Sequence, residues 1–223
     1  MKTARKKSAA GRVKGGMAAT PKRRVEPRTS QAGKRDAILL AALEEFSTRG
    51  FAAGRLDDVA RRAGVAKGTI YLYFRDKETL LQELVRAELS PVVAALEALP
   101  IGDLPLRDVA ERLVTIFVRE IIGTHRKDVI RLVLTEGPRF PVIGEFYYRE
   151  VVARVMAVIR GMAQRAVERG ELPNDALVRF PQLLAAPGIV AIIWSSLFDR
   201  WAKIDVEALM RAHLDLVFAG RAA

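Results

Sequence analysis

The sequence contains no cysteine among its 223 residues, and its only two histidines, His125 and His213, lie far apart in the chain. The missing cysteine excludes disulfide-stabilised folds, thiolate metal sites and cysteine nucleophiles, and it agrees with a reducing cytoplasm. Neither histidine has a partner nearby in the sequence that would make it a metal ligand. We therefore expect neither a metal nor another cofactor.

Signatures of catalysis are also missing. The chain has no glycine-rich nucleotide fingerprint, no P-loop and no HExxH motif. Its adjacent acidic pairs, Glu44-Glu45 and Asp57-Asp58, are not ready acid/base couples, because neighbouring residues of a helix point to different faces. The sequence therefore predicts a protein that is not an enzyme.

No stretch is long enough to span a membrane. The most apolar run, residues 188–198, falls short of the roughly 20 residues that a spanning helix needs. The N-terminus carries charge but lacks the apolar segment of a secretory signal. We expect a cytoplasmic protein.

Basic charge is concentrated at the N-terminus. Residues 1–35 hold 12 of the 37 Lys and Arg side chains but one of the 26 acidic ones, so 25 of each remain in the rest of the chain. Residues 1–32 have little to bury and are expected to form a disordered tail. Such a tail is either a solubilising segment or an arm that follows DNA phosphates or enters a minor groove.

The remaining chain has helical periodicity and no strand alternation, which predicts an all-α fold of about nine helices. The expected helices cover residues 34–49, 56–63, 67–74, 77–99, 106–123, 127–136, 143–169, 175–199 and 205–218.

Residues 56–74 predict two short helices joined by a tight turn. Gly64 ends the first helix, because glycine takes the left-handed conformation without steric cost. Ile70 and Phe74 lie four residues apart and give the second helix one buried face. Its other face carries Lys67, Thr69, Tyr71 and Tyr73. This build is typical of a helix-turn-helix, although an ordinary helical corner has the same pattern.

The flanking residues favour the first interpretation. Residues 34–84 resemble the N-terminal domain of the TetR family of bacterial transcriptional regulators in one uninterrupted register. The matching points are Phe46, Arg49-Gly50-Phe51, Val59-Ala60, Ala63-Gly64-Val65, Lys67-Gly68-Thr69-Ile70-Tyr71, Tyr73-Phe74, Lys77-Glu78 and Leu80-Leu81. The resemblance implies a homodimer with a three-helix DNA-binding domain at residues 33–85. A larger helical domain for ligand binding and dimerisation is expected at residues 86–223.

The resemblance also assigns the DNA contacts. It places Lys67, Gly68 and Tyr71 against bases, and Thr69, Tyr73 and Lys77 against phosphates. The family commonly has Ser or Thr just before each motif helix, where this chain has Gly54-Arg55 and Ala66. Arg55 is expected to compensate through a charged phosphate contact.

The C-terminal domain yields two further sets of candidates. Bulky apolar residues of the middle helices, any of which is also suited to plain core, are expected to line a pocket for a small hydrophobic effector: Phe117, Ile121, Phe140, Phe146, Tyr147, Met156 and Trp194. Stripes on the last two helices are expected to form the dimer interface, with core as the alternative: Leu183, Val190, Leu197, Trp201, Val206, Leu209, His213 and Leu216.

These features predict a ligand-responsive repressor that binds a palindromic DNA operator as a homodimer and leaves it when an effector binds. Two alternatives remain. One is an architectural protein that binds any duplex through its basic tail, and the other is a TetR-like activator.

Overall fold

The computed structural model describes residues 31–100 and 102–219, so nearly all of the predicted basic tail lies outside the described residues. Every regular element in the described part is helical, which confirms the predicted all-α fold. Ten helices are present there when each π-helical turn is counted with the α-helix that it continues.

The α-helices are α1 (Gln31–Ala53), α2 (Leu56–Arg62), α3 (Lys67–Tyr71), α4 (Lys77–Glu97), α5 (Leu106–Phe117), α6 (Arg126–Glu136), α7 (Pro141–Tyr147), α8 (Ala153–Glu168), α9 (Ala176–Arg179), α10 (Gln182–Leu197) and α11 (Val206–Phe218). The π-helical turns are η1 (Val118–Ile122), which extends α5, and η2 (Tyr148–Val152), which joins α7 to α8.

The helix boundaries follow from local chemistry. Gly50 interrupts α1 with a φ of 77°, and Gly64 takes a φ of 66° in the turn between α2 and α3, as the sequence predicts. Asp76 begins α4 as its N-cap and accepts a hydrogen bond from the backbone N–H of Thr79 at 2.7 Å. Hydrogen bonding from Thr79, first from its side chain and then from its backbone N–H, lowers the pKa of Asp76 to about 2.

One predicted helix is divided. The sequence predicts a single helix over residues 175–199, but the structure has the short α9, a break at Phe180 and then α10. Phe180 has φ −127° and ψ 69°, outside the helical region. The cause is Pro181, whose ring disfavours helical backbone in the residue before it.

Two other prolines lie inside helices, and neighbouring side chains donate to carbonyls near them. Pro187 lacks the N–H that would bond the carbonyl of Leu183, and His213 Nε2 lies 2.8 Å from that oxygen. In α4, Arg126 Nε donates at 2.9 Å to the carbonyl of Glu88, about one turn before Pro91. The first contact also joins α10 to α11.

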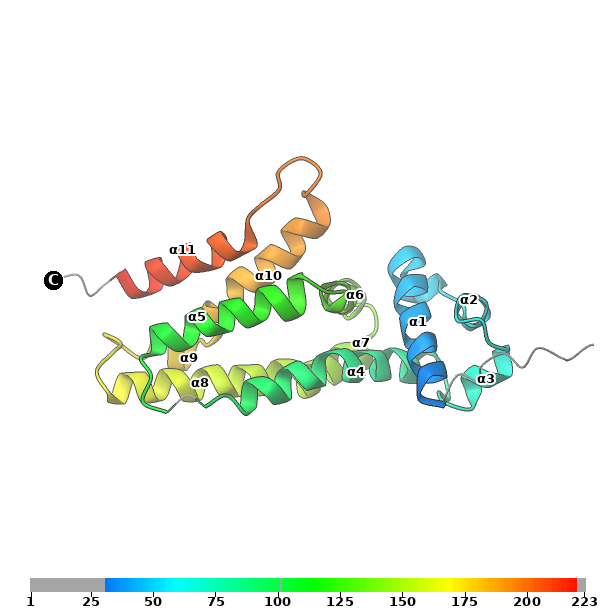
Figure 1. The fold of residues 1–223 in the computed structure, drawn as a ribbon, viewed down its shortest axis with the longest axis horizontal. Helices are drawn as coiled ribbons and strands as arrows, with labels where there is room; N and C mark the ends of the chain where they lie inside the picture. The colour runs from blue at the N-terminus through cyan, green and yellow to red at the C-terminus, as the bar shows by residue number, and fades with distance from the viewer. Residues whose placement is uncertain (1–30, 101, 220–223) are drawn as a thin grey trace, which may run out of the picture.

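The helices form an elongated molecule with α1–α3 at one end (Figure 1). Helix α4 leads from that end along the body, and α10 and α11 form a hairpin whose loop stands away from the body. One apolar core joins α1–α4 to α6 and α7, and a second joins α5, α8, α10 and α11. The first core therefore fixes the α1–α3 unit on the body.

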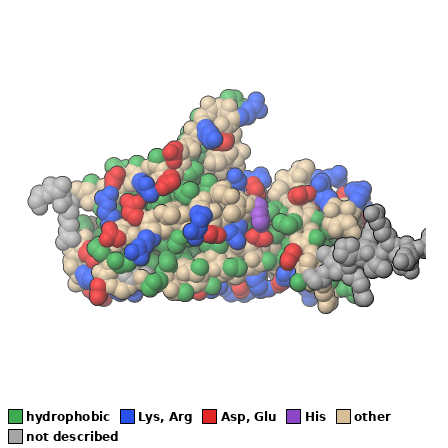
Figure 2. Space-filling view, viewed as in Figure 1, with side chains coloured by type: hydrophobic (Ala, Val, Ile, Leu, Met, Phe, Trp, Pro, Cys, Tyr) green, Lys and Arg blue, Asp and Glu red, His purple; other side chains and the backbone are tan. Residues whose placement is uncertain are grey.

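Acidic and basic side chains are mixed over the visible face of the body (Figure 2), in keeping with the balanced charge beyond the tail. None of the helices in the described ranges has the length and hydropathy needed to cross a bilayer.

Candidate nucleic-acid interface and ligand cavity

Helix α3 is held on the protein by its inner face. Ile70 and Phe74 are fully buried in the first core, as their spacing predicts. Helix α2 is in turn fixed to α1, because Arg62 Nε donates at 3.0 Å to the buried carboxylate of Glu45. These contacts leave the opposite face of α3 directed away from the core.

The outer face of α3 is exposed. The side chain of Tyr71 keeps 51% of its surface, Lys67 and Gly68 are exposed, and Thr69 and Tyr73 are half-buried. Leu72, which the sequence reasoning did not single out, is 83% exposed and extends this surface beyond the end of α3. Its signal was available in the sequence, because the helical positions of Ile70 and Phe74 direct Leu72 outward.

Two cations on this surface share one carboxylate. Lys67 Nζ lies 2.7 Å from Asp57 Oδ1, and Arg55 Nη2 lies 3.7 Å from Asp57 Oδ2. The hydrogen bond from Lys67 lowers the pKa of Asp57 and raises that of Lys67. All three side chains are exposed, so the ion pairs are open to exchange with phosphates or bases.

Gly68 is not required by packing within the chain. A Cβ at this position would meet no atom within 4 Å, and the backbone has no positive φ. The open space agrees with the prediction that Gly68 allows close approach of a duplex.

The structure gives Lys77 a different role from the predicted phosphate contact. Its Nζ donates to the carbonyls of Phe51, Ala52 and Gly54, at 2.6, 3.0 and 3.2 Å, and lies 4.5 Å from the centre of the Phe51 ring. The ammonium therefore satisfies backbone acceptors after the Gly50 kink. Such a capping role has no clear sequence signal, because the acceptors lie more than 20 residues away.

An apolar cavity of about 730 Å³ lies among α4, α5, α8 and α10. Of the predicted pocket residues, Phe117, Ile121, Tyr147 and Met156 line it. Aliphatic side chains from α4 and α10 supply much of the remaining wall, a contribution that the sequence reasoning missed. Among them are Leu89, Val93, Leu96, Leu184, Ile189 and Val190.

Three predicted pocket residues lie elsewhere. Phe140 packs edge-to-face on Phe51, with ring centres 4.8 Å apart, and so joins the loop after α6 to α1. Phe146 is buried in the first core, with the Arg86 guanidinium 5.0 Å from its ring centre. Trp194 donates through Nε1 to the carbonyl of Ala202 at 2.6 Å, in the α10–α11 hairpin. None of these three side chains lines the apolar cavity.

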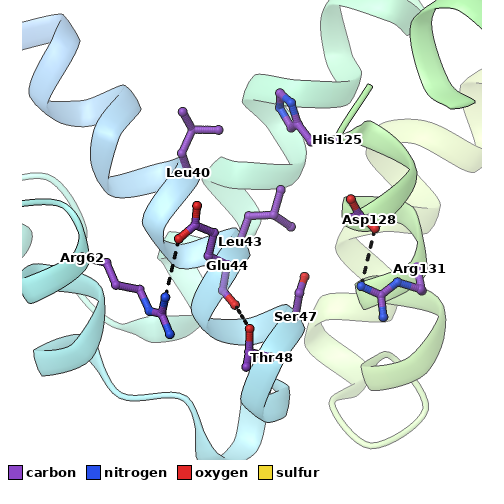
Figure 3. A pocket seen from close by; sticks show the side chains of 9 residues that line it. All are labelled: Leu40, Leu43, Glu44, Ser47, Thr48, Arg62, His125, Asp128 and Arg131. Atoms are coloured by element: carbon purple, nitrogen blue, oxygen red, sulfur yellow. Dashed lines mark hydrogen bonds and ion pairs between the residues drawn. The ribbon is translucent and has the colours of Figure 1, made fainter. Parts of the chain in front are cut away.

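A second, polar cleft of about 510 Å³ separates α1 from α6 (Figure 3). Its charges pair within each wall. Arg62 faces Glu44 at 3.6 Å on one side, and Arg131 faces Asp128 at 3.5 Å on the other. No ion pair between described residues crosses the cleft, so the charges within it do not fix α1 against α6.

The last two helices present a large apolar surface. Helix α10 is apolar around most of its circumference, which is typical of a helix that is buried on all sides. Yet the structure leaves many of its side chains exposed. On α10 and the loop that follows it, these include Leu183, Val190, Ile193, Leu197, Phe198 and Trp201.

The predicted dimer residues divide into two groups. Leu183, Val190, Leu197 and Trp201 are on that exposed surface, Leu216 of α11 is exposed, and Leu209 and His213 are partly buried. Val206 is instead buried in the second core. It shares its buried stripe with Met210 and Leu214, at the four-residue spacing of one helix face.

Comparison with known proteins identifies the two halves of the chain. Residues 38–84 match the family model described as bacterial regulatory proteins, tetR family, and residues 100–196 match the C-terminal domain of AefR-like transcriptional repressors. The transcriptional repressor KstR2 of Rhodococcus jostii (strain RHA1) is 25% identical over 202 residues, covering 87% of this chain and 94% of KstR2.

Solved structures share the fold. The fatty acid degradation regulator FadR from Bacillus halodurans superposes with a TM-score of 0.69 at 22% identity, over 86% of this chain and 98% of that one. FadR from Bacillus subtilis, solved in complex with stearoyl-CoA, gives a TM-score of 0.65 at 21% identity, over 83% and 98% of the two chains. The helix-turn-helix, the helical body and these matches together show that the chain belongs to the TetR family of bacterial transcriptional regulators.

Proposed function

We propose that the protein is a homodimeric repressor that reads a palindromic operator with α3 and is released by a small hydrophobic effector. In this proposal residues 33–85 bind DNA, residues 86–223 bind the effector and form the dimer, and the protein acts in the cytoplasm without a catalytic role. The observation that carries the proposal is the division of α3 into a buried inner face and an exposed outer face of cationic, aromatic and glycine residues.

The outer face of α3 suits the major groove. Lys67 can donate to guanine acceptors, and Tyr71 can contact a thymine methyl or a sugar. Arg55, Thr69 and Tyr73 surround them as candidate phosphate contacts. One helix of five residues reaches few bases, whereas two such helices about 34 Å apart read both half-sites of a palindrome.

Effector release is supported by the cavity. It lies among α4, α5, α8 and α10, and α4 also carries the packing that holds α1–α3 on the body. FadR from Bacillus subtilis is a fold relative whose structure holds stearoyl-CoA. A ligand that fits the cavity only in a form with misplaced reading helices shifts the population away from DNA.

Selection from a random DNA pool, followed by gel shifts with the selected sequence, tests the proposal. We expect a palindrome, and we expect Lys67→Ala and Tyr71→Ala each to weaken its binding about tenfold or more, since a good base contact contributes roughly 1–3 kcal/mol. Lys127→Ala, which removes an exposed lysine of α6, serves as the matched charge control.

Competition with random DNA at physiological salt separates this function from architectural binding. A repressor retains its operator in excess random duplex, and an architectural protein does not. Unchanged operator affinity in both α3 variants contradicts the assignment of the reading face.

A further inference from the structure

The described lining of the ligand cavity contains no acidic side chain and a single basic one, Arg160 of α8. The rest of the wall is apolar apart from Tyr147, Tyr148 and Gln182. An apolar wall with one cation and no anion disfavours a cationic ligand, because a buried charge without a partner carries a large desolvation cost. The same wall suits an apolar molecule with an anionic group.

Arg160 has donors to offer such a group. Its Nε donates at 3.2 Å to the carbonyl of Val178, while its terminal nitrogens have no hydrogen-bond or ion-pair partner among the described residues. The residue is exposed, whereas its neighbour Ile159 is buried, so Arg160 lies at the cavity rim and Ile159 in its wall. The two terminal nitrogens of a guanidinium match a carboxylate or phosphate in bidentate geometry.

Tyr147 supplies a second polar group, deep in the wall. Its side chain is 9% exposed, and its hydroxyl makes no hydrogen bond to any described residue. Burial raises the pKa of Tyr147 to about 12, so the hydroxyl is protonated at neutral pH and acts as a donor. Unlike the fully enclosed, unpaired oxygens of Glu45, Ser47, Ser90 and Glu136, the Tyr147 hydroxyl keeps some accessible surface, so an acceptor oxygen on a ligand in the cavity can reach it and accept its hydrogen bond.

The Tyr147 hydroxyl and the Arg160 guanidinium belong to residues that lie far apart along one continuous helix. Tyr147 ends α7 and Arg160 lies in α8, and η2 joins these helices without a break. Arg160 lies thirteen positions after Tyr147, and at about 1.5 Å of rise per residue this places the two residues roughly 20 Å apart along the helix axis. A ligand that meets both groups is therefore elongated.

We propose that the effector is an elongated apolar anion, with its carboxylate or phosphate at Arg160 and a neutral acceptor oxygen at its buried end against Tyr147. This proposal rests on the effector-binding function proposed above and specifies the chemistry of the effector. A long-chain fatty acid with an oxygen at its ω end has the required composition.

Calorimetric titration of the full-length protein with four C16 probes tests the proposal: palmitate, ω-hydroxypalmitate, cetyl alcohol and cetylamine. We expect ω-hydroxypalmitate to bind most tightly, followed by palmitate, then cetyl alcohol and last cetylamine. Arg160→Gln is expected to weaken both acids about tenfold and to leave cetyl alcohol unchanged, since a charge-assisted hydrogen bond is lost only with the acids.

Tyr147→Phe is expected to weaken ω-hydroxypalmitate about fivefold and to leave palmitate unchanged, because only the first has an oxygen at the buried end. Arg149→Gln is the matched control, because Arg149 lies on the same continuous helix but outside the cavity lining. This variant is expected to bind every probe as the parent chain does. Circular dichroism confirms that each variant is folded.

Three results overturn the proposal: no probe binds, cetylamine binds as tightly as palmitate, or Arg160→Gln weakens all probes equally. Gel shifts with the selected operator are run on the same samples. Intact operator binding with any of these results rejects the ligand chemistry alone, whereas loss of sequence-specific DNA binding by the parent chain rejects the proposed function itself.

Discussion

At the scale of single residues, Lys77 separates a stabilising role from a DNA-binding one. Its ammonium donates to three carbonyls after the Gly50 kink, whereas the resemblance assigns it to a DNA phosphate. We predict that Lys77→Met lowers the free energy of unfolding by about 2 kcal/mol, because hydrogen bonds that involve a charged group contribute roughly 1.5–3 kcal/mol and these are partly solvated. Urea denaturation measures the loss.

DNA binding by the same variant shows which role dominates. If Lys77 only caps α1, the salt dependence of operator binding stays as in the parent chain. A lost phosphate contact would instead reduce the slope by about one. Lys67→Met is the comparison, because its exposed side chain is expected to affect DNA binding and not stability. If Lys77→Met instead reduced the salt slope of operator binding without lowering stability, while Lys67→Met lowered stability without affecting DNA binding, the assignment of Lys77 to a phosphate contact would be restored.

Single residues also show where the sequence is informative. The four-residue spacing of Ile70 and Phe74 correctly predicted which face of α3 is buried. Bulk and apolar character are a weaker guide, because Phe140, Phe146 and Trp194 pack on other groups instead of lining the cavity. Periodicity indicates that a side chain points inward, but it does not distinguish a solid core from a cavity wall, since both bury apolar surface.

At the scale of helices, α10 continues through Pro187, and a neighbouring helix contacts the carbonyl that this proline leaves unpaired. The proline leaves the carbonyl of Leu183 without its helical donor, and His213 of α11 lies within hydrogen-bond distance of that oxygen. We predict that His213→Ala lowers the free energy of unfolding by about 1 kcal/mol, the typical contribution of one hydrogen bond.

A double-mutant cycle isolates this bond. Pro187→Ala restores the backbone N–H that normally donates to the carbonyl of Leu183 in a helix. In that background His213→Ala is therefore expected to lower the free energy of unfolding by distinctly less. Both variants are followed by thermal and urea denaturation. Equal costs of His213→Ala in the two backgrounds would show that the histidine contributes through packing alone.

Helix boundaries were predicted well where a residue changes the backbone directly. Gly64 follows the end of α2 and Asp76 begins α4 as expected, whereas Gly50 kinks α1 at the position where the sequence predicts its end. Pro181 and Pro187 were both assigned to helix interiors, yet the chain breaks at the first and continues through the second. His213, 26 residues beyond Pro187, contacts the carbonyl that this proline leaves without its helical donor, and no local rule includes such a tertiary contact.

At the scale of the whole molecule, the ligand cavity and the proposed dimer surface share α10. Val190 lines the cavity and is 49% exposed, and its neighbour Ile189 also does both. The sequence indicated an excess of apolar surface on this helix but not that the same helix walls the cavity. A second copy packed on α10 would therefore contact a helix that also walls the effector cavity. Effector binding and the geometry of the two reading helices would be linked through this shared helix.

The dimer surface can be tested without disturbing the core. Leu197 of α10 is 57% exposed and lies outside the cavity lining, so Leu197→Glu is expected to leave the single chain folded. In a dimer that covers α10, the new carboxylate would be buried without a partner, at a cost of several kcal/mol. We predict a shift from dimer to monomer at micromolar concentration, measured by light scattering.

Operator binding should change with the oligomeric state. A monomer engages one half-site, so the affinity of Leu197→Glu for the full palindrome is expected to approach that of the parent chain for a single half-site. Val142→Glu places the same charge on an exposed apolar position of α7 and is expected to remain a dimer. If Leu197→Glu stays dimeric with full operator affinity, the two reading helices must be paired through another surface, because the exposed apolar face of α10 would then not be the interface.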